Sequence, residues 1–254
     1  MLDAILPAEI FVLFMVFVRL GAALMLVPGL GEVSVPRTIR LALAIALTAV
    51  IGPGVAADFP GLPASPVALL VMIAGEAAVG ILMGAAARLT MSGLQVAGTV
   101  IAFQSGLGYA QTVDPTQGTQ SAIVSAFFGL LGVVLIFASN LHHLIIRALH
   151  DSYVLFPPGA LPPVEGFAEI AVDLVAGAFL LGMQIAAPFI VYGLIFYTGL
   201  GLLARLMPQF QFFFIVMPLQ ITVSLFILMV SVSASMMWFL DYYESSMAQF
   251  LALG

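Results

Sequence analysis

The sequence has 254 residues, of which 63% are hydrophobic and only 7% are charged, and its mean hydropathy is +1.23. Soluble globular chains carry about 25% charged residues, so most of the surface of this chain cannot face water. Six basic and twelve acidic residues give a net charge of −6, which argues against the clustered basic face that nucleic-acid binding needs. The chain has no cysteine, which excludes disulfides, thiol nucleophiles and thiolate metal sites.

Apolar runs organise the chain and predict an all-α membrane protein of about six long, partly broken hydrophobic helices, treated as one domain over residues 1–254. No positively charged segment precedes the first run, so we expect a retained span rather than a cleaved signal peptide. The last two runs exceed the roughly 20 residues that a bilayer requires, and Pro188 and Pro218 are their expected breaks. The runs are Ile10–Pro28, Ile39–Ile51, Val67–Ala87, Ser121–Leu141, Ile170–Leu203 and Phe212–Leu240.

The arginines indicate an orientation. Arg37 and Arg40 follow the first run, Arg88 follows the third and Arg205 follows the fifth. Because cytoplasmic loops of membrane proteins are enriched in basic residues, these ends are expected to be cytoplasmic and the N-terminus external. Arg147 is the exception to this pattern.

The stretch from Ser92 to Ser121 differs from the rest of the chain. It is rich in Gly, Ser, Thr and Gln and carries a single charge, Asp114. Non-helical backbone at membrane depth is tolerated only where it is buried in protein or lines a water-filled cavity, which would make this stretch a conduit or gate segment. A cytoplasmic loop with a short amphipathic helix agrees equally well with the pattern, and the pattern alone leaves both open.

Two charged residues, Arg19 and Glu76, lie inside apolar runs. Each charge costs roughly 2.5 to 3.5 kcal/mol on insertion-based scales, so such residues usually pair or face a cavity. A proton or ion relay is one interpretation, but no series of further acids accompanies them, which favours a structural ion pair or a subunit contact. We therefore predict that Arg19 and Glu76 interact. Gly80 and Gly84 follow at a spacing that permits close helix approach.

Neither catalysis nor metal binding is indicated elsewhere. The adjacent histidines His142 and His143 point to different helix faces, and the i, i+4 histidine pair of zinc enzymes is missing. His143, Arg147 and His150 instead form one polar stripe, which we favour as an interfacial feature over a metal site. We find no nucleophile elbow and no phosphate or dinucleotide loop, so no catalytic residue, cofactor or metal is expected. A small-solute secondary transporter and an intramembrane enzyme remain as alternatives; the first would show internal repeats, and none is found.

Short motifs spread over most of the chain are individually weak but fairly specific in their order and spacing. They are Arg19-Leu20-Gly21 with Pro28, Val35-Pro36-Arg37 with Arg40, Glu76 with Gly80, Gly106-Leu107-Gly108-Tyr109-Ala110 with Asp114-Pro115, His142-His143 followed by Ser152 and Pro157, and Arg205-Leu206-Met207-Pro208-Gln209 with Pro218-Leu219. In this order they resemble the FliR family, membrane subunits of the flagellar export gate that are related to the SctT subunits of virulence secretion systems.

The resemblance implies a non-enzymatic subunit built of helical hairpins within an oligomeric export gate in the bacterial inner membrane, at the flagellar basal body. FliP-like and FliQ-like subunits would complete the channel entrance, with FlhB-like and FlhA-like proteins nearby and unfolded export substrates as transient ligands. A virulence secretion gate is the alternative within the same resemblance.

The resemblance also implies a channel plug at residues 106–120. A polar but nearly uncharged segment solvates passing backbones without trapping them, and glycines allow the unusual dihedrals that a moving gate needs. The residues expected to form the plug are Gly106, Leu107, Gly108, Tyr109, Ala110, Asp114 and Pro115.

Overall fold

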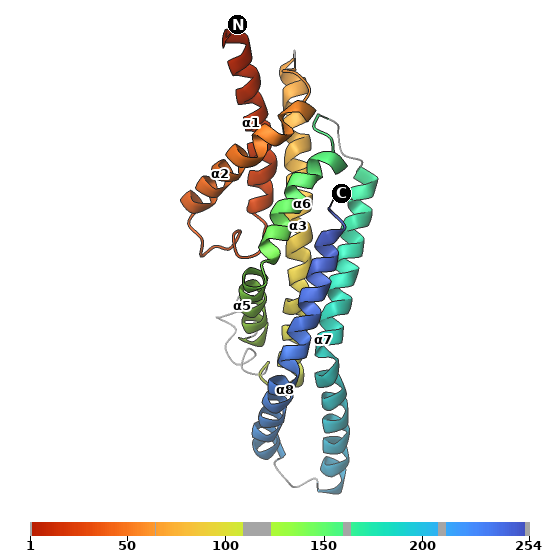
Figure 1. Cartoon of the computed structure of the whole chain (residues 1–254). Coiled ribbons are helices and arrows are strands. Elements are labelled where there is room, and N and C mark those ends of the chain that lie inside the picture. Colours follow the sequence, from red (N-terminus) through yellow and green to blue (C-terminus); the bar gives the residue numbers. More distant parts are fainter. Residues whose placement is uncertain (1, 64, 109–122, 160–163, 208–211, 252–254) are drawn as a thin grey trace. The chain divides into compact units, whose positions relative to one another are not determined.

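The computed structural model describes residues 2–63, 65–108, 123–159, 164–207 and 212–251, and most of these residues are helical. No strand occurs in these residues, so the predicted all-α class is confirmed. The elements are α1 (Leu2–Leu24), α2 (Arg37–Val55), the 3₁₀ turn η1 (Ala56–Asp58), α3 (Pro66–Gln104), α5 (Ile123–Ala138), α6 (Leu141–Leu155), α7 (Val164–Leu206) and α8 (Phe212–Ala248) (Figure 1).

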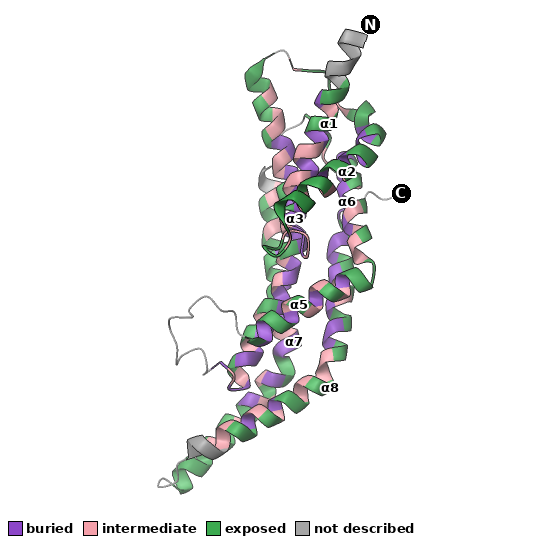
Figure 2. Cartoon of the chain, turned by 90° about the vertical axis from the view of Figure 1, so that its left-hand side faces the viewer, coloured by how far each residue is buried: buried purple, intermediate pink, exposed green. Residues whose placement is uncertain are grey.

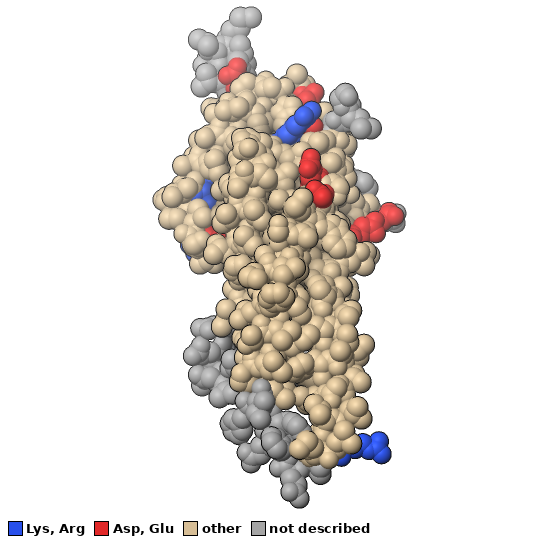
Figure 3. Space-filling model, turned by 60° about the horizontal axis from the view of Figure 1, so that its bottom comes forward, with Lys and Arg blue, Asp and Glu red and all other residues tan. Residues whose placement is uncertain are grey.

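The helices confirm a multi-pass membrane protein. Four of them contain segments that are long and apolar enough to cross a bilayer, and the bent pair α5–α6 would make a fifth. Large apolar side chains such as Val50, Leu194 and Met229 are more than half exposed, as lipid-facing or partner-facing residues are. Charged side chains are sparse on the face shown in Figure 3. The four segments are Arg37–Asp58, Pro66–Gln104, Gly166–Leu206 and Val216–Ala248.

The end of α3 is the boundary that differs most from the one that the sequence pattern predicts. α3 does not end near Ala87 but continues to Gln104, so the first part of the polar stretch is helical. Small polar residues are compatible with this helix, because a side chain such as that of Thr99 can bond within it: Thr99 Oγ1 donates a hydrogen bond to the carbonyl of Gln95 at 2.8 Å. The interruption that hydropathy indicates therefore begins at Ser105.

The predicted proline breaks are wrong. α7 and α8 continue through Pro188 and Pro218, and at 43 residues α7 is about 65 Å long. The break lies instead between α5 and α6, where Asn140 adopts a left-handed backbone conformation with φ 61°. Asparagine tolerates this conformation better than most residues. α5 has only 16 residues, too few to span a bilayer by itself.

The chain contacts divide the protein into two compact units. The first comprises Met1–Thr90, Ile136–Val175 and Tyr243–Gly254. Within it α1 packs against both α2 and α3. Most residues of α2 are exposed (Figure 2). The prediction of a single membrane domain stays a prediction.

Close packing of α1 on α3 depends on the two glycines of α3. A Cβ at Gly80 would collide with the carbonyl oxygen of Arg19, and one at Gly84 would lie 2.5 Å from the carbonyl oxygen of Ala23. No real side chain tolerates such contact with backbone, so the helices approach along this step only because both residues lack a Cβ.

The second unit comprises Met91–Leu135 and Ala176–Tyr242. The end of α3 packs against α5, where Gly98 faces the backbone of Ser125, and against α7, where Gly182 faces the carbonyl of Gly93. α7 and α8 run in opposite directions as a helical hairpin, since Gly177 meets Tyr242 and Tyr192 meets Gln220. In this unit, helices from later in the chain therefore pack against the end of α3.

We expect Gly84→Leu to destabilise the protein by about 3 kcal/mol or more, because the new side chain has to push α1 away from α3. The measurement is the thermal unfolding temperature of the purified chain in detergent. Gly129→Leu on α5 is the matched control, since nothing lies within 4 Å of a Cβ at that position. An equal fall for both variants would contradict the packing role of Gly84.

Candidate functional site

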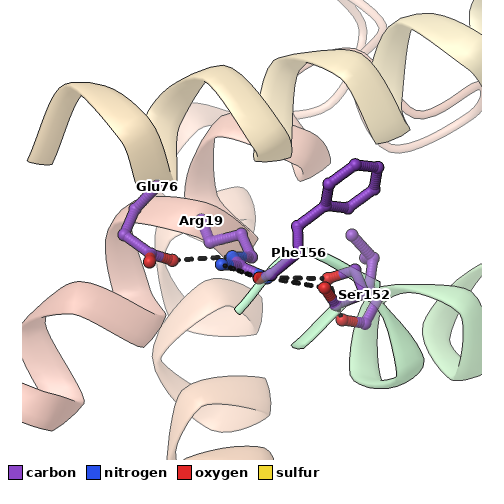
Figure 4. Close-up of polar contacts among 5 residues, drawn as sticks. Arg19, Glu76, Ser152 and Phe156 are labelled. Carbon is purple, nitrogen blue, oxygen red and sulfur yellow. Dashed lines mark hydrogen bonds and ion pairs between the residues drawn. The ribbon is translucent and has the colours of Figure 1, made fainter. Parts of the chain in front are cut away.

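Arg19 is a charged residue at the centre of the first unit. Its side chain is 1% exposed, and apolar residues precede and follow it along α1. Arg19 Nε lies 2.6 Å from Glu76 Oε2, and the Glu76 side chain is 3% exposed (Figure 4). The predicted pairing of the two intramembrane charges is confirmed. Its assignment as a structural pair rather than a relay stays a prediction.

The other nitrogens of Arg19 bind the end of α6. Nη1 donates to the carbonyl of Ser152 at 3.0 Å and to its hydroxyl at 3.2 Å, and Nη2 donates to the carbonyl of Phe156 at 3.1 Å (Figure 4). The last carbonyls of a helix lack partners within the helix and carry the negative end of its dipole. Arg19 thus caps α6 while pairing with α3.

Tyr153 completes this cluster. The guanidinium carbon of Arg19 lies 4.0 Å from the centre of the Tyr153 ring, a cation–π contact, and Tyr153 is 2% exposed. Phe59 packs against Tyr153, with the two ring centroids 5.9 Å apart. Since guanidinium groups do not release protons in proteins, Arg19 holds a fixed positive charge in this cluster.

The segment after α3 is held by a second polar cluster, in the second unit. Gly106 has φ +79°, the left-handed conformation that commonly ends helices. The amide of Gly108 donates back to the carbonyl of Ala102 at 2.9 Å, and the hydroxyl of Ser105 donates to the same carbonyl at 3.1 Å. Residues 105–108 therefore form a closed turn, in which Gly106 and Gly108 are buried and Leu107 is half-buried.

Gln220 of α8 fastens this turn to the rest of the unit. Its Nε2 donates to the carbonyl of Gln104 and to the Tyr197 hydroxyl, both at 2.8 Å, and the residue is 3% exposed. A Cβ at Gly106 would lie 3.3 Å from the Gln220 amide, so turn and amide are in contact. Both protons of the amide nitrogen are used, and α3, α7 and α8 meet at one side chain.

The remaining predicted residues fall into two groups. Tyr109, Ala110, Asp114 and Pro115 lie outside the described residues, so most of the predicted plug is a prediction still. The polar stripe of α6 is exposed: His143, Arg147 and His150 share one face, and Asp151 lies 3.9 Å from Arg147 Nε and 3.1 Å from His150 Nδ1. Among the described residues no group of three potential ligands could hold a metal ion.

Sequence reasoning missed the partners that make both clusters. Ser152, Phe156 and Tyr153 follow Arg19 by more than 130 residues and contribute mainly backbone or ring contacts, which leave no sequence signal. Gln220 did leave a sequence signal, because it is an amide among the mainly apolar residues of α8. A polar residue in a membrane helix usually contacts protein or water, and this alone could have identified it.

Comparison with known proteins places the chain. A family profile described as bacterial export proteins, family 1, matches residues 10–246. The chain belongs to this family. A relative named flagellar biosynthetic protein FliR from Caulobacter vibrioides is 37% identical, over 93% of this chain and 94% of that protein. A protein of the same name from Escherichia coli is 30% identical over 84% and 80%. The Yop proteins translocation protein T of Yersinia pestis is 22% identical over 68% and 67%.

Removing Arg19 is expected to be costly in this export-family protein. Arg19→Leu leaves the Glu76 carboxylate buried without its partner and two α6 carbonyls without a donor, so we expect a loss of about 3–5 kcal/mol. Arg19→Leu with Glu76→Leu should recover part of this loss, whereas exchanging the two charges should recover less, since a carboxylate cannot donate to carbonyls. Thermal unfolding in detergent measures all three; full recovery by the exchanged pair would contradict the capping role.

Gln220→Leu is expected to loosen the turn at residues 105–108. It removes both donors from Gln104 and Tyr197, which should cost about 1–3 kcal/mol and accelerate hydrogen exchange at the amides of Ser105 and Gly108. Thr222→Val on the same helix is the control, because the Thr222 hydroxyl is exposed and donates only to the carbonyl of Pro218, at 2.8 Å. Unchanged exchange in Gln220→Leu would show that the amide does not hold the turn.

Proposed function

We propose that this protein is a non-enzymatic subunit of the flagellar protein export gate, located in the bacterial inner membrane at the base of the flagellum. With FliP-like and FliQ-like subunits it forms the channel entrance through which unfolded flagellar proteins leave, and FlhB-like and FlhA-like proteins adjoin it. The observation that carries the proposal is the 37% identity to a flagellar biosynthetic protein over 93% of this chain.

The surface of the chain supports a role within an assembly. Many large apolar side chains are exposed along α7 and α8, among them Leu194, Ile195 and Met229, each at least 68% exposed. Stretches of this kind are covered either by lipid or by other subunits. The length of α7 favours subunits for part of it, because about 65 Å is roughly twice the thickness of the bilayer core.

The turn at residues 105–108 supports a plug role for residues 106–120. It is the point at which the chain leaves α3, and Gln220 and the Gly108 amide hold it in one conformation. A fixed root allows the following polar residues to obstruct one place in a channel. The almost uncharged composition of the segment gives it no strong affinity for a passing chain.

A virulence secretion gate is the second candidate, favoured by the similarity to the Yersinia translocation protein T. That relative is 22% identical over 68% of the chain, against 37% over 93% for the Caulobacter flagellar protein. We therefore favour the flagellar system. In either system the gate does not bind nucleotide, and its energy would come from other subunits or from the proton gradient.

The experiment is co-purification of the tagged chain with FliP-like and FliQ-like proteins, together with deletion of residues 106–120. We expect the wild-type chain and the deletion variant to recover both partners equally, and only the variant to make the cell membrane leak ions. Absence of both partners from the wild-type preparation would overturn the proposed function. Co-purification with an ion-tight membrane around the assembled, opened deletion complex would overturn the plug role alone.

A further inference from the structure

A hollow between α1 and α2, in the first unit, combines charge with apolar walls. Its volume is about 250 Å³, and it is lined by Phe17, Gly21 and Leu24 of α1, by Leu41 of α2 and by the guanidinium-bearing residues Arg37 and Arg40. It lies outside both clusters described above, and the proposed export role makes no use of it.

Neither arginine forms an ion pair with any described acid. Arg40 Nη2 donates to the carbonyl of Val35 at 3.1 Å, while Arg40 Nε is buried without a hydrogen-bond partner in the described part of the chain. Glu32, the nearest acid in sequence, does not line the hollow. Two cationic groups with no carboxylate, one of them with a buried unsatisfied N–H, call for an anion.

The start of α2 also favours a bound anion. Arg37 is the first residue of the helix, the preceding Pro36 offers no side-chain cap, and the first turn holds no acidic residue. The positive end of the helix dipole is therefore uncompensated beside the two guanidinium groups. The case for anion binding therefore rests on three features: the two neighbouring arginines, the buried Nε of Arg40 and the start of α2.

The apolar walls specify the rest of the ligand. An inorganic anion would occupy only the arginine end and leave the exposed Leu41 side chain and the half-buried Phe17 ring uncovered. A molecule with a phosphate at one end and hydrocarbon at the other covers both parts. We propose that the hollow binds an anionic phospholipid, with its phosphate on Arg37 and Arg40 and an acyl chain along α1.

The charge distribution of the sequence agrees with this ligand. The arginine ends of the helices are expected to face the cytoplasm, and the cytoplasmic leaflet contains the anionic lipids. Basic pockets between membrane helices on that side are known binding sites for anionic headgroups. An acidic segment of another subunit is the competing occupant, and the experiment separates the two.

The experiment measures lipid binding to the purified full-length chain in neutral detergent by native mass spectrometry. The probes are dioleoyl phosphatidylglycerol, dioleoyl phosphatidylcholine and soluble glycerol phosphate. We expect phosphatidylglycerol to bind at least tenfold more tightly than phosphatidylcholine. Glycerol phosphate at millimolar concentration should fail to displace it, because the soluble ligand lacks the acyl chain.

Three variants test the two halves of the site. Arg37→Gln with Arg40→Gln should weaken phosphatidylglycerol binding roughly 30-fold, about fivefold for each arginine. Gly21→Leu keeps both arginines but fills the apolar part, and a side chain fits there because nothing lies within 4 Å of a Cβ at Gly21. Gly21→Leu should weaken phosphatidylglycerol binding as strongly as the double arginine variant does. Arg88→Gln with Arg205→Gln removes the same charge elsewhere and should change the affinity less than twofold.

Several results would overturn the proposal. Equal phosphatidylglycerol affinity in the Arg37→Gln, Arg40→Gln variant and the wild type would show that the hollow is not the lipid site. Displacement of the lipid by glycerol phosphate would show that the hollow binds a free anion instead. Loss of the lipid when the chain assembles with its partners, together with protection of Arg37 from phenylglyoxal, would assign the hollow to another subunit. If the double variant does not fold, Arg37→Gln and Gly21→Leu give the same comparison.

Discussion

The buried guanidinium of Arg19 is the interaction on which the first unit depends. One side chain pairs with Glu76 of α3, caps the last carbonyls of α6 and stacks on the Tyr153 ring. An unpaired charge in this apolar setting would be expensive, so the three contacts have to form together. The close approach at Gly80, whose missing Cβ admits the Arg19 backbone, brings the partners within reach. Packing and electrostatics therefore require each other here.

The second unit uses a neutral group for a similar purpose. The Gln220 amide joins the end of α3 to α7 and α8 without placing a charge near the predicted plug. An amide fastens a turn by directional hydrogen bonds, yet its bonds are weaker than those of an ion pair and more easily exchanged. A fixed ion cluster therefore joins the helices of one unit, and a neutral amide joins those of the other.

Several elements could be predicted from the sequence for simple reasons. Low charge and long apolar runs determine a helical membrane protein, because backbone groups in lipid must bond within their own helix. Because a charge buried in an apolar helix is costly, the sequence also predicts that Arg19 and Glu76 pair. Helix boundaries were less predictable: Pro188 and Pro218 lie within continuous helices, while Asn140 marks the actual break. Proline and polar residues are tolerated where neighbouring helices satisfy the backbone, and hydropathy does not record such neighbours.

The sequence by itself determined the class of the protein, its membrane location and, through ordered motifs, its family. Composition and spacing are local properties, and these conclusions need nothing else. Only the tertiary structure decided that Arg19 caps a helix more than 120 residues away, that Gln220 holds the turn after α3, and that Arg37 and Arg40 border an apolar hollow. Each of these depends on groups from other helices. Every residue has a backbone carbonyl, so the sequence does not show which carbonyl or which apolar wall folding brings beside a given side chain.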